Sequence, residues 1–190
     1  MNTPAHAILN ALVLAREPRQ GMLTPATIGA ILPDVPMVLF YAYQRLLAGR
    51  SESQIWGQLY FNPNWQAFFD VFNSLPLVLV GGILAYSVGS GWLWVLCTSM
   101  GLHDISDFLV HHDDAHRHFF PFSDWRFQSP VSYWDPQHHG DIFLLGESIF
   151  TIAGVFLLTY WYRETRAHFV FLGFAGVYGL YFVYVFWMWA

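Results

Sequence analysis

The chain has 190 residues, of which 55% are hydrophobic and 11% are charged, and its formal net charge at pH 7 is −5. Soluble domains carry roughly twice this share of charged residues, so most of the surface is expected to face lipid. The eight basic residues are all arginines, and the acidic balance speaks against nucleic acid as a partner. Cys97 is the single cysteine, so no disulfide can form within the chain.

Apolar runs predict six helices in one integral membrane domain that covers residues 1–190. Threonine followed by proline marks two helix starts, at Pro4 and at Pro25. The predicted helices cover about residues 4–16, 24–47, 67–88, 92–111, 141–160 and 167–189. The first is shorter than the roughly 20 residues that a span needs. The expected fold class is therefore all-α, a multi-pass transmembrane bundle of about five to six helices.

Local signals refine this outline. The first residues lack the basic region of a signal peptide, so the first helix is expected to be retained, with a turn at 16–21. Two prolines flank Asp34 and predict a break inside the second helix. Residues 48–66 are polar and aromatic, as in a connection at the membrane interface. Gly89 and Gly91 predict a tight turn, which makes the helices on either side antiparallel neighbours.

The longest polar stretch covers residues 112–140. A loop longer than about 12–15 residues is usually functional or disordered. Its aromatic residues and three prolines predict an ordered polar lid loop. Trp125, Tyr133 and Trp134 are expected to lie against the lipid headgroups.

Residues 102–118 contain five histidines and four aspartates. Ionisable groups beside a bilayer are costly, so this cluster predicts a functional site. His103, Asp107 and His111 are spaced by four and would share one helix face, and His112 with His116 would form a second pair. Imidazole nitrogens and carboxylate oxygens suit zinc, manganese, iron or nickel.

Helix parity predicts where the other ligands come from. If all six helices cross the membrane, the starts of the first, third and fifth helices lie at the same end as the cluster. Asp34 lies in the middle of the second predicted helix. It could reach that end if the chain at the proline-flanked break dips into the bundle from that end. The predicted metal ligands are His6, Asp34, Asp70, His103, Asp107, His111, His112 and His116, and they would hold one or two divalent ions, with zinc expected. Asp114 and His118 are the predicted acid–base catalytic groups.

Several ionisable residues at this end of the bundle also have a purely structural interpretation. Asp34 could cap the half-helix that follows it, and Asp70 could be an acid favoured at a helix N-terminus. His103 and Asp107 could be a buried hydrogen-bonded pair. Glu147 could pair with an arginine within the bundle.

With these residues in view, the chain resembles the predicted membrane-bound metal-dependent hydrolases, a broad bacterial family. The shared features are residues 3–7 (TPAHA), residues 29–34 (GAILPD), Asp70 with Ser74, His103 with Asp107, and residues 121–123 (PFS). The resemblance implies a helical bundle that binds metal through His6, Asp34, Asp70, His103 and Asp107. Where many members carry His-Arg and then Thr-His-Ser, this chain has residues 70–74 (DVFNS), so it lacks two imidazoles there. The chain is also similar to the helical zinc phospholipase C and nuclease group, which favours phosphate esters as substrates.

The expected function is a membrane-embedded metal-dependent hydrolase, in which a metal-activated water attacks a phosphoester or a lipid-like ester at one membrane face. A metal transporter or sensor, or a structural membrane subunit, are the alternatives. The expected location is the bacterial inner membrane, with membrane lipid as a partner. Four arginines fall on each side, so the positive-inside rule leaves the side of the site open.

Overall fold

A computed structural model describes residues 1–16, 18 and 21–189, and throughout this part of the chain the regular elements are all helices. Within these described residues, three helical segments are long and apolar enough to cross a membrane: Leu23–Leu47, Pro63–Ser87 and Gly140–Trp161. The all-α prediction is thus confirmed. Of the turn expected at 16–21, residues 17, 19 and 20 lie outside the described part.

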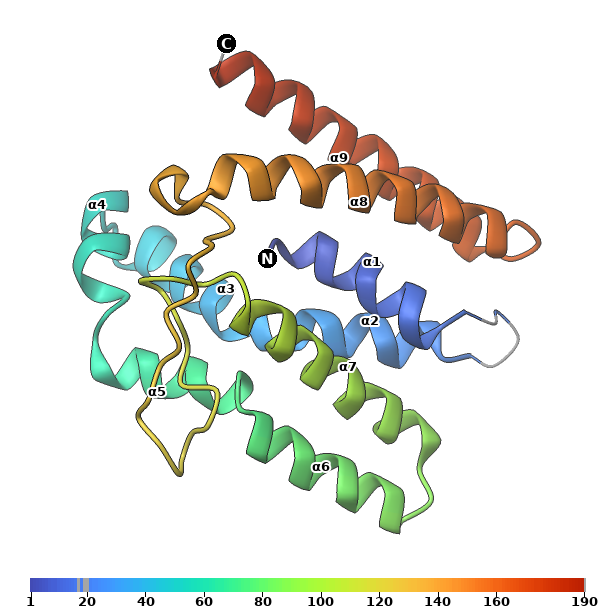
Figure 1. The fold of residues 1–190 in the computed structure, drawn as a ribbon, viewed down its shortest axis with the longest axis horizontal. Helices are drawn as coiled ribbons and strands as arrows, with labels where there is room; N and C mark the ends of the chain where they lie inside the picture. Colours follow the sequence, from blue (N-terminus) through green and yellow to red (C-terminus); the bar gives the residue numbers. More distant parts are fainter. Residues whose placement is uncertain (17, 19–20, 190) are drawn as a thin grey trace.

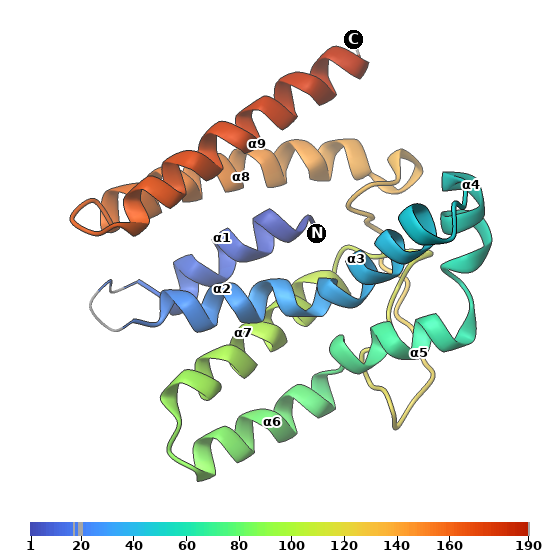
Figure 2. The same cartoon turned by 180° about the vertical axis from the view of Figure 1, so that it is seen from behind.

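The main helices pack in a row, each against its neighbour (Figure 1). In order across the molecule they are α9 (Ala167–Trp189), α8 (Gly140–Trp161), α1 (Thr3–Leu14), α2 (Leu23–Ile31), α7 (Gly91–Phe108) and α6 (Leu75–Ser87). The lid gathers at one end of this row together with α4 (Glu52–Gln54), and the turns after α6 and α8 lie at the other end (Figures 1 and 2). The start of α1 and the end of α7 both reach toward the lid end, as the parity of the helices predicts.

The second predicted helix does contain the expected break. After α2 the chain forms a 3-10 turn, η2 (Leu32–Asp34), before α3 (Val35–Ala42) and a π turn, η3 (Tyr43–Leu47). Pro33 and Pro36 lack amide hydrogens, so regular α-helical bonding cannot run through this point. The break places Asp34 within the bundle, where its side chain is 11% exposed.

The third predicted helix, by contrast, is two helices. α5 (Pro63–Phe72) ends before Asn73, and α6 starts anew with Ser74 as its cap, whose Oγ accepts from the amide of Leu77 at 3.2 Å. Asp70 therefore lies near the C-terminus of α5, and the prediction that it opens a helix is wrong. A carboxylate at that position is disfavoured by the helix dipole, so it needs cationic partners.

The predicted helix at 92–111 ends early, at Phe108. Beyond it the lid supplies the hydrogen bonds: Ser129 N donates to His111 O at 2.9 Å, and Tyr133 N donates to Val110 O at 2.9 Å. The lid is thus ordered as predicted, with only the short η5 (Pro136–His138) as helix in its described residues. His112 and His116 do not share a helix, so the prediction that they pair across one turn is wrong.

A polar contact and a glycine hold the centre of the bundle together. Asn10 Nδ2 on α1 donates to Ser99 Oγ on α7 at 2.7 Å, and Ser99 Oγ donates to Ala26 O on α2 at 2.5 Å. Gly29 on α2 allows the close approach of α7, because a Cβ there would lie 2.4 Å from the carbonyl oxygen of Leu96. Asn10 is one turn from His6 and Ser99 is one turn from His103, so this contact fixes the register in which the two histidines meet.

Candidate metal centre

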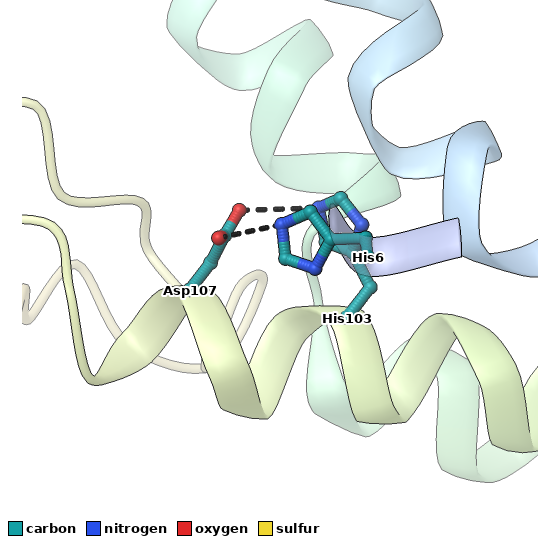
Figure 3. A group of neighbouring side chains, drawn as sticks. All are labelled: His6, His103 and Asp107. Carbon is teal, nitrogen blue, oxygen red and sulfur yellow. Dashed lines mark ion pairs between the residues drawn. The ribbon is translucent and has the colours of Figure 1, made fainter. Parts of the chain in front are cut away.

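His6 from α1 and the pair His103 and Asp107 from α7 converge at the lid end of the bundle (Figure 3). His6 Nε2 lies 2.8 Å from Asp107 Oδ1, and His103 Nε2 lies 3.1 Å from Asp107 Oδ2. The two imidazoles stack with their centroids 3.6 Å apart, and one ligand atom from each residue lies within 4.8 Å of the others. Both histidines are fully buried and Asp107 is 2% exposed. The group could therefore hold a metal ion.

The neighbours of the two histidines determine which nitrogen carries the proton. His103 Nδ1 lies 2.7 Å from the carbonyl oxygen of Ala30, which can only accept. His6 Nδ1 lies 3.1 Å from Ser106 Oγ, whose hydroxyl is placed to donate to the carbonyl oxygen of His103 at 2.8 Å. In both rings the Nδ1 is therefore protonated and the Nε2 keeps its lone pair.

The two Nε2 lone pairs face a carboxylate. Both Nε2 atoms are buried and make no hydrogen bond, although Asp107 oxygens lie close to each. Lone pairs of nitrogen and oxygen repel one another at such distances, so a cation near the carboxylate stabilises the group, and the N-terminal ammonium of Met1 donates to Asp107 Oδ1 at 2.6 Å. A divalent metal ion would satisfy all three side chains at once, and the hydrogen bonds at Nδ1 are the usual support of metal-bound histidines.

Asp34 also reaches this group, as the break in the second helix predicts. Its Oδ1 lies 3.7 Å from His103 Nε2, and its Oδ2 accepts from Thr3 Oγ1 at 2.5 Å. The side chain makes no hydrogen bond to the start of α3, so the interpretation of Asp34 as a helix cap is wrong.

His111 links the metal centre to the lid. Its Nε2 lies 3.4 Å from Asp107 Oδ2 and its Nδ1 lies 3.0 Å from Asp114 Oδ2. Burial lowers the pKa of His111, but the neighbouring carboxylates of Asp107 and Asp114 together outweigh this and raise it to about 9. Burial likewise raises the pKa of Asp114, yet the neighbouring His111, His116 and Trp134 side chains together bring that pKa below its ordinary value. Asp107, His111 and Asp114 thus form a continuous polar chain.

Asp70 lies apart from this group, although it was predicted as a ligand. Its carboxylate is fully buried and accepts from Arg117 Nε at 2.6 Å and from the amide of Arg117 at 2.9 Å, and Arg126 Nη2 is 3.7 Å away. The arginines supply the positive charge that its position near the end of α5 requires. The residues predicted as one site are thus divided between a His–His–Asp group and an Asp–Arg cluster.

Three lid histidines of the predicted set also lie outside the His–His–Asp group. His112 stacks on His138, with centroids 3.6 Å apart. His116 Nδ1 lies 3.8 Å from Asp70, and His118 packs edge-on against Phe108. Burial holds the pKa of His116 well below its ordinary value and lowers that of His118 to about 4, so both are neutral at pH 7.

Several contributors to the site carry no metal-ligand signal in the sequence. Ser106 and the carbonyl of Ala30 orient the ligands, and Thr3 orients Asp34. Ser106 could have been found as the residue three positions after His103, on the same helix face. Glu147 accepts from Asn2 N at 2.7 Å and Asn2 Nδ2 at 2.6 Å, so its predicted pairing with an arginine is wrong.

A cavity of about 610 Å³ opens beside Asp114. Its wall carries the aromatic side chains of Trp56, Tyr60, Phe61, Tyr133 and Trp134. The side chains of Asp113 and Asp114 complete its polar part. The prediction that Tyr133 faces lipid headgroups does not fit this placement, because its ring contacts His111 with centroids 4.8 Å apart.

No family model, no curated protein and no solved structure matches this chain. The fold and the site define a general class: an all-helical protein with helices able to span a membrane and a buried His–His–Asp group that could hold a metal ion. A more particular function has to be inferred from the chemistry of the site.

Proposed function

We propose that this chain is a multi-pass membrane protein that binds one zinc ion through His6, His103 and Asp107 and hydrolyses an ester of an amphiphile. The observation that carries the proposal is the pair of buried Nε2 atoms that make no hydrogen bond and face the same carboxylate. Resemblance to the predicted membrane-bound metal-dependent hydrolases, and a place in the bacterial inner membrane, belong to the same proposal.

The ligand set suits hydrolysis. Catalytic zinc sites commonly have three protein ligands and keep one position open, and a zinc ion in such a site supplies an activated water. In our proposal His6, His103 and Asp107 hold the ion. Oδ1 of Asp34 orients the water at the open position. Ser106 and the Ala30 carbonyl keep both imidazoles in the binding tautomer.

The lid provides the substrate side. The cavity beside Asp114 has a volume in the range of small-molecule sites, and its aromatic wall would accept part of an amphiphile. Asp114 would exchange a proton with the reacting ester, with His111 connecting it to Asp107. His118, the other predicted catalytic group, receives no role in the reaction, because its ring contacts are with Phe108 and His116.

The first test is metal analysis of the purified protein with three variants. About one zinc ion per chain is expected in the native protein and in His139→Asn, which alters an exposed histidine in left-handed backbone that asparagine tolerates. His103→Ala and Asp107→Ala should lose the ion while keeping their helical circular dichroism. A native protein that binds no divalent metal contradicts the proposal. Iron instead of zinc would point to oxygen chemistry, which two histidines and a carboxylate also support.

The burial of all three ligands favours a second candidate, a metal carrier or sensor without hydrolysis. Activity of the zinc-loaded protein in lipid nanodiscs separates the two. A hydrolase should cleave a phosphodiester or carboxylic ester of a lipid, and both alanine variants should lose this activity. Stoichiometric zinc that exchanges rapidly, with no cleavage of either ester, would instead support the carrier.

A further inference from the structure

We infer that the cavity beside Asp114 binds an organic ammonium cation, and that this cation is the headgroup of the amphiphile. The second half of this statement rests on the proposed function, whereas binding of the cation does not require the metal ion. The inference combines the shape, the aromatic wall and the charge of the cavity.

The cavity has the size and composition of a ligand site. Its volume of about 610 Å³ falls within the roughly 300–1,000 Å³ of small-molecule sites. Five aromatic side chains contribute to its wall, together with Met37 and Gly57. The five aromatic side chains come from two parts of the chain, the connection that contains η4 (Ile55–Leu59) and the lid. The cavity therefore depends on the ordered lid.

The polar side-chain atoms of three of these aromatic residues already have partners in the protein. Trp56 Nε1 donates to Glu52 at 3.0 Å, and Trp134 Nε1 donates to Asp114 Oδ2 at 3.1 Å. The hydroxyl of Tyr60 donates to the carbonyl oxygen of Asp114 at 3.4 Å. What these three side chains can still offer a ligand is the π surface of their rings, and such surfaces attract quaternary and protonated amines.

The charge of the wall has the matching sign. Among the residues that the structure describes, Asp113 and Asp114 are the charged residues that line the cavity, and no lysine, arginine or histidine lines it. Asp114 Oδ1 is buried and makes no hydrogen bond, whereas Oδ2 accepts from Trp134 Nε1 and lies 3.0 Å from His111 Nδ1. A cation in the cavity would be attracted by both carboxylates, and the partial burial of Asp114 strengthens that attraction because water screens it less.

Other ligands fit this wall less well. A free phosphate would meet two carboxylates and no cationic side chain. A plain acyl chain would fill the aromatic part but would leave Asp114 Oδ1 without a partner. An ammonium group with an apolar body satisfies both parts. Bound there, it would lie next to the Asp114–His111–Asp107 chain, so the ester of the same molecule would be near the metal centre.

The experiment compares choline with its uncharged carbon analogue, 3,3-dimethyl-1-butanol, which has the same shape. The protein is kept in a neutral maltoside detergent, and binding is followed by tryptophan fluorescence and by calorimetry. We expect choline to bind at least about tenfold more tightly, a difference of about 1.4 kcal/mol. Equal affinities, or no binding of either compound, would overturn the inference.

Variants identify the cavity as the place of binding. Asp113 is exposed, so its substitution should not disturb folding. Asp113→Asn should weaken choline binding about threefold, and Asp113→Lys by more, since one exposed ion pair contributes little to binding and a lysine would repel the cation. Trp56→Leu should weaken it further. Glu164→Gln, which removes an exposed acid at the far end of α8, is the matched control and should bind as the native protein does. Unchanged binding in Asp113→Lys would place the cation elsewhere.

Two further arms identify the source of the cation and separate the two proposals. If the headgroup of a lipid occupies the cavity, choline should bind more weakly in phosphatidylcholine nanodiscs than in phosphatidylglycerol nanodiscs. Equal binding in both would indicate a free amine and would contradict the headgroup assignment. Chelator-treated protein should still prefer choline. Choline binding without ester cleavage would support the ammonium site and contradict the proposed hydrolase. Ester cleavage without a preference for choline would support the hydrolase and contradict the ammonium site.

Discussion

Hydrogen bonds at the back of each imidazole determine what the metal centre can do. Ser106 Oγ faces His6 Nδ1 at 3.1 Å, and Ala30 O faces His103 Nδ1 at 2.7 Å. Both acceptors force the proton onto Nδ1 and leave Nε2 free to bind a cation. The sequence predicts the ligand atoms through the four-residue spacing of His103 and Asp107, but it does not reveal these acceptors, because they depend on how α1 and α2 pack against α7.

The first prediction removes one acceptor. Ser106→Ala leaves His6 Nδ1 without a partner, so the ring can adopt the other tautomer. Loss of such a supporting contact typically costs about 10–100-fold in metal affinity. Competition with a chromophoric zinc chelator measures this change. Ser87→Ala is the control, since Ser87 makes a similar bond to its own helix at an exposed site. Equal zinc affinity in both variants would show that Ser106 does not support the site.

A second prediction concerns acid. Burial lowers the pKa of His118 to about 4 from an ordinary value of 6.5. Because the pKa of His118 is lower in the folded protein than in the unfolded chain, protons bind to the unfolded chain first as the pH falls, and this favours unfolding. The protein should therefore lose stability as pH falls from about 6.5 towards 4. Thermal melting of chelator-treated protein at pH 7 and pH 5 measures the loss, and His118→Asn should reduce it. If His118→Asn loses as much thermal stability between pH 7 and pH 5 as the native protein does, groups other than His118 cause the loss.

At the level of elements, local signals predict the break at Asp34 but not the break between α5 and α6. The prolines around Asp34 mark a break that the structure contains. The ends of α5 and α7 were misplaced because other parts of the chain decide them. Leu75 N donates to His118 O at 3.0 Å and Ser74 Oγ to Phe120 O at 2.5 Å, so the lid stabilises the start of α6 as a separate helix. Such contacts join segments more than 40 residues apart, and a periodic pattern does not show them.

The packing of α2 against α7 leads to a third prediction. Gly29→Ala would place a Cβ 2.4 Å from Leu96 O, which is backbone and cannot move aside. The two helices would have to separate, at a cost of about 1–3 kcal/mol. Gly101→Ala is the control, because its Cβ would lie 3.4 Å from Val78 Cγ1, an ordinary contact. We expect a lower melting temperature and weaker zinc binding only in Gly29→Ala. Similar behaviour of the two variants would contradict this account of the packing.

At the scale of the whole molecule, helix parity predicts that His6 and Asp34 meet His103 and Asp107, and the structure brings all four together. The same reasoning places Asp70 at this end of the bundle but cannot say what it touches. Arg117 and Arg126 of the lid form ion pairs with Asp70. Their positions depend on the path of a long irregular loop. The sequence therefore predicts the end of the molecule where ionisable groups gather. Only the structure shows which of them belong to the His–His–Asp group and which to the Asp–Arg cluster.

That division gives a fourth prediction. Asp70→Asn leaves two guanidinium groups beside a neutral amide, and removal of one partner from a buried ion pair costs about 3–5 kcal/mol. The lid should loosen, as measured by a lower melting temperature and faster proteolysis between residues 112 and 140. Because Asp70 lies outside the His–His–Asp group, zinc stoichiometry should stay the same. Asp124→Asn is the control, since its carboxylate binds Arg117 from an exposed position. Loss of zinc in Asp70→Asn would mean that Asp70 is a ligand after all.

The most direct test of the metal centre is X-ray absorption spectroscopy at the zinc edge of the loaded protein. We predict two imidazole nitrogens at about 2.0–2.1 Å and carboxylate oxygen at about 2.0–2.2 Å, with no sulfur ligand. His6→Ala should remove one imidazole from the spectrum or abolish zinc binding. A zinc environment that keeps both imidazoles in His6→Ala, or a native protein that takes up no zinc, would contradict the central claim that His6, His103 and Asp107 form one metal site.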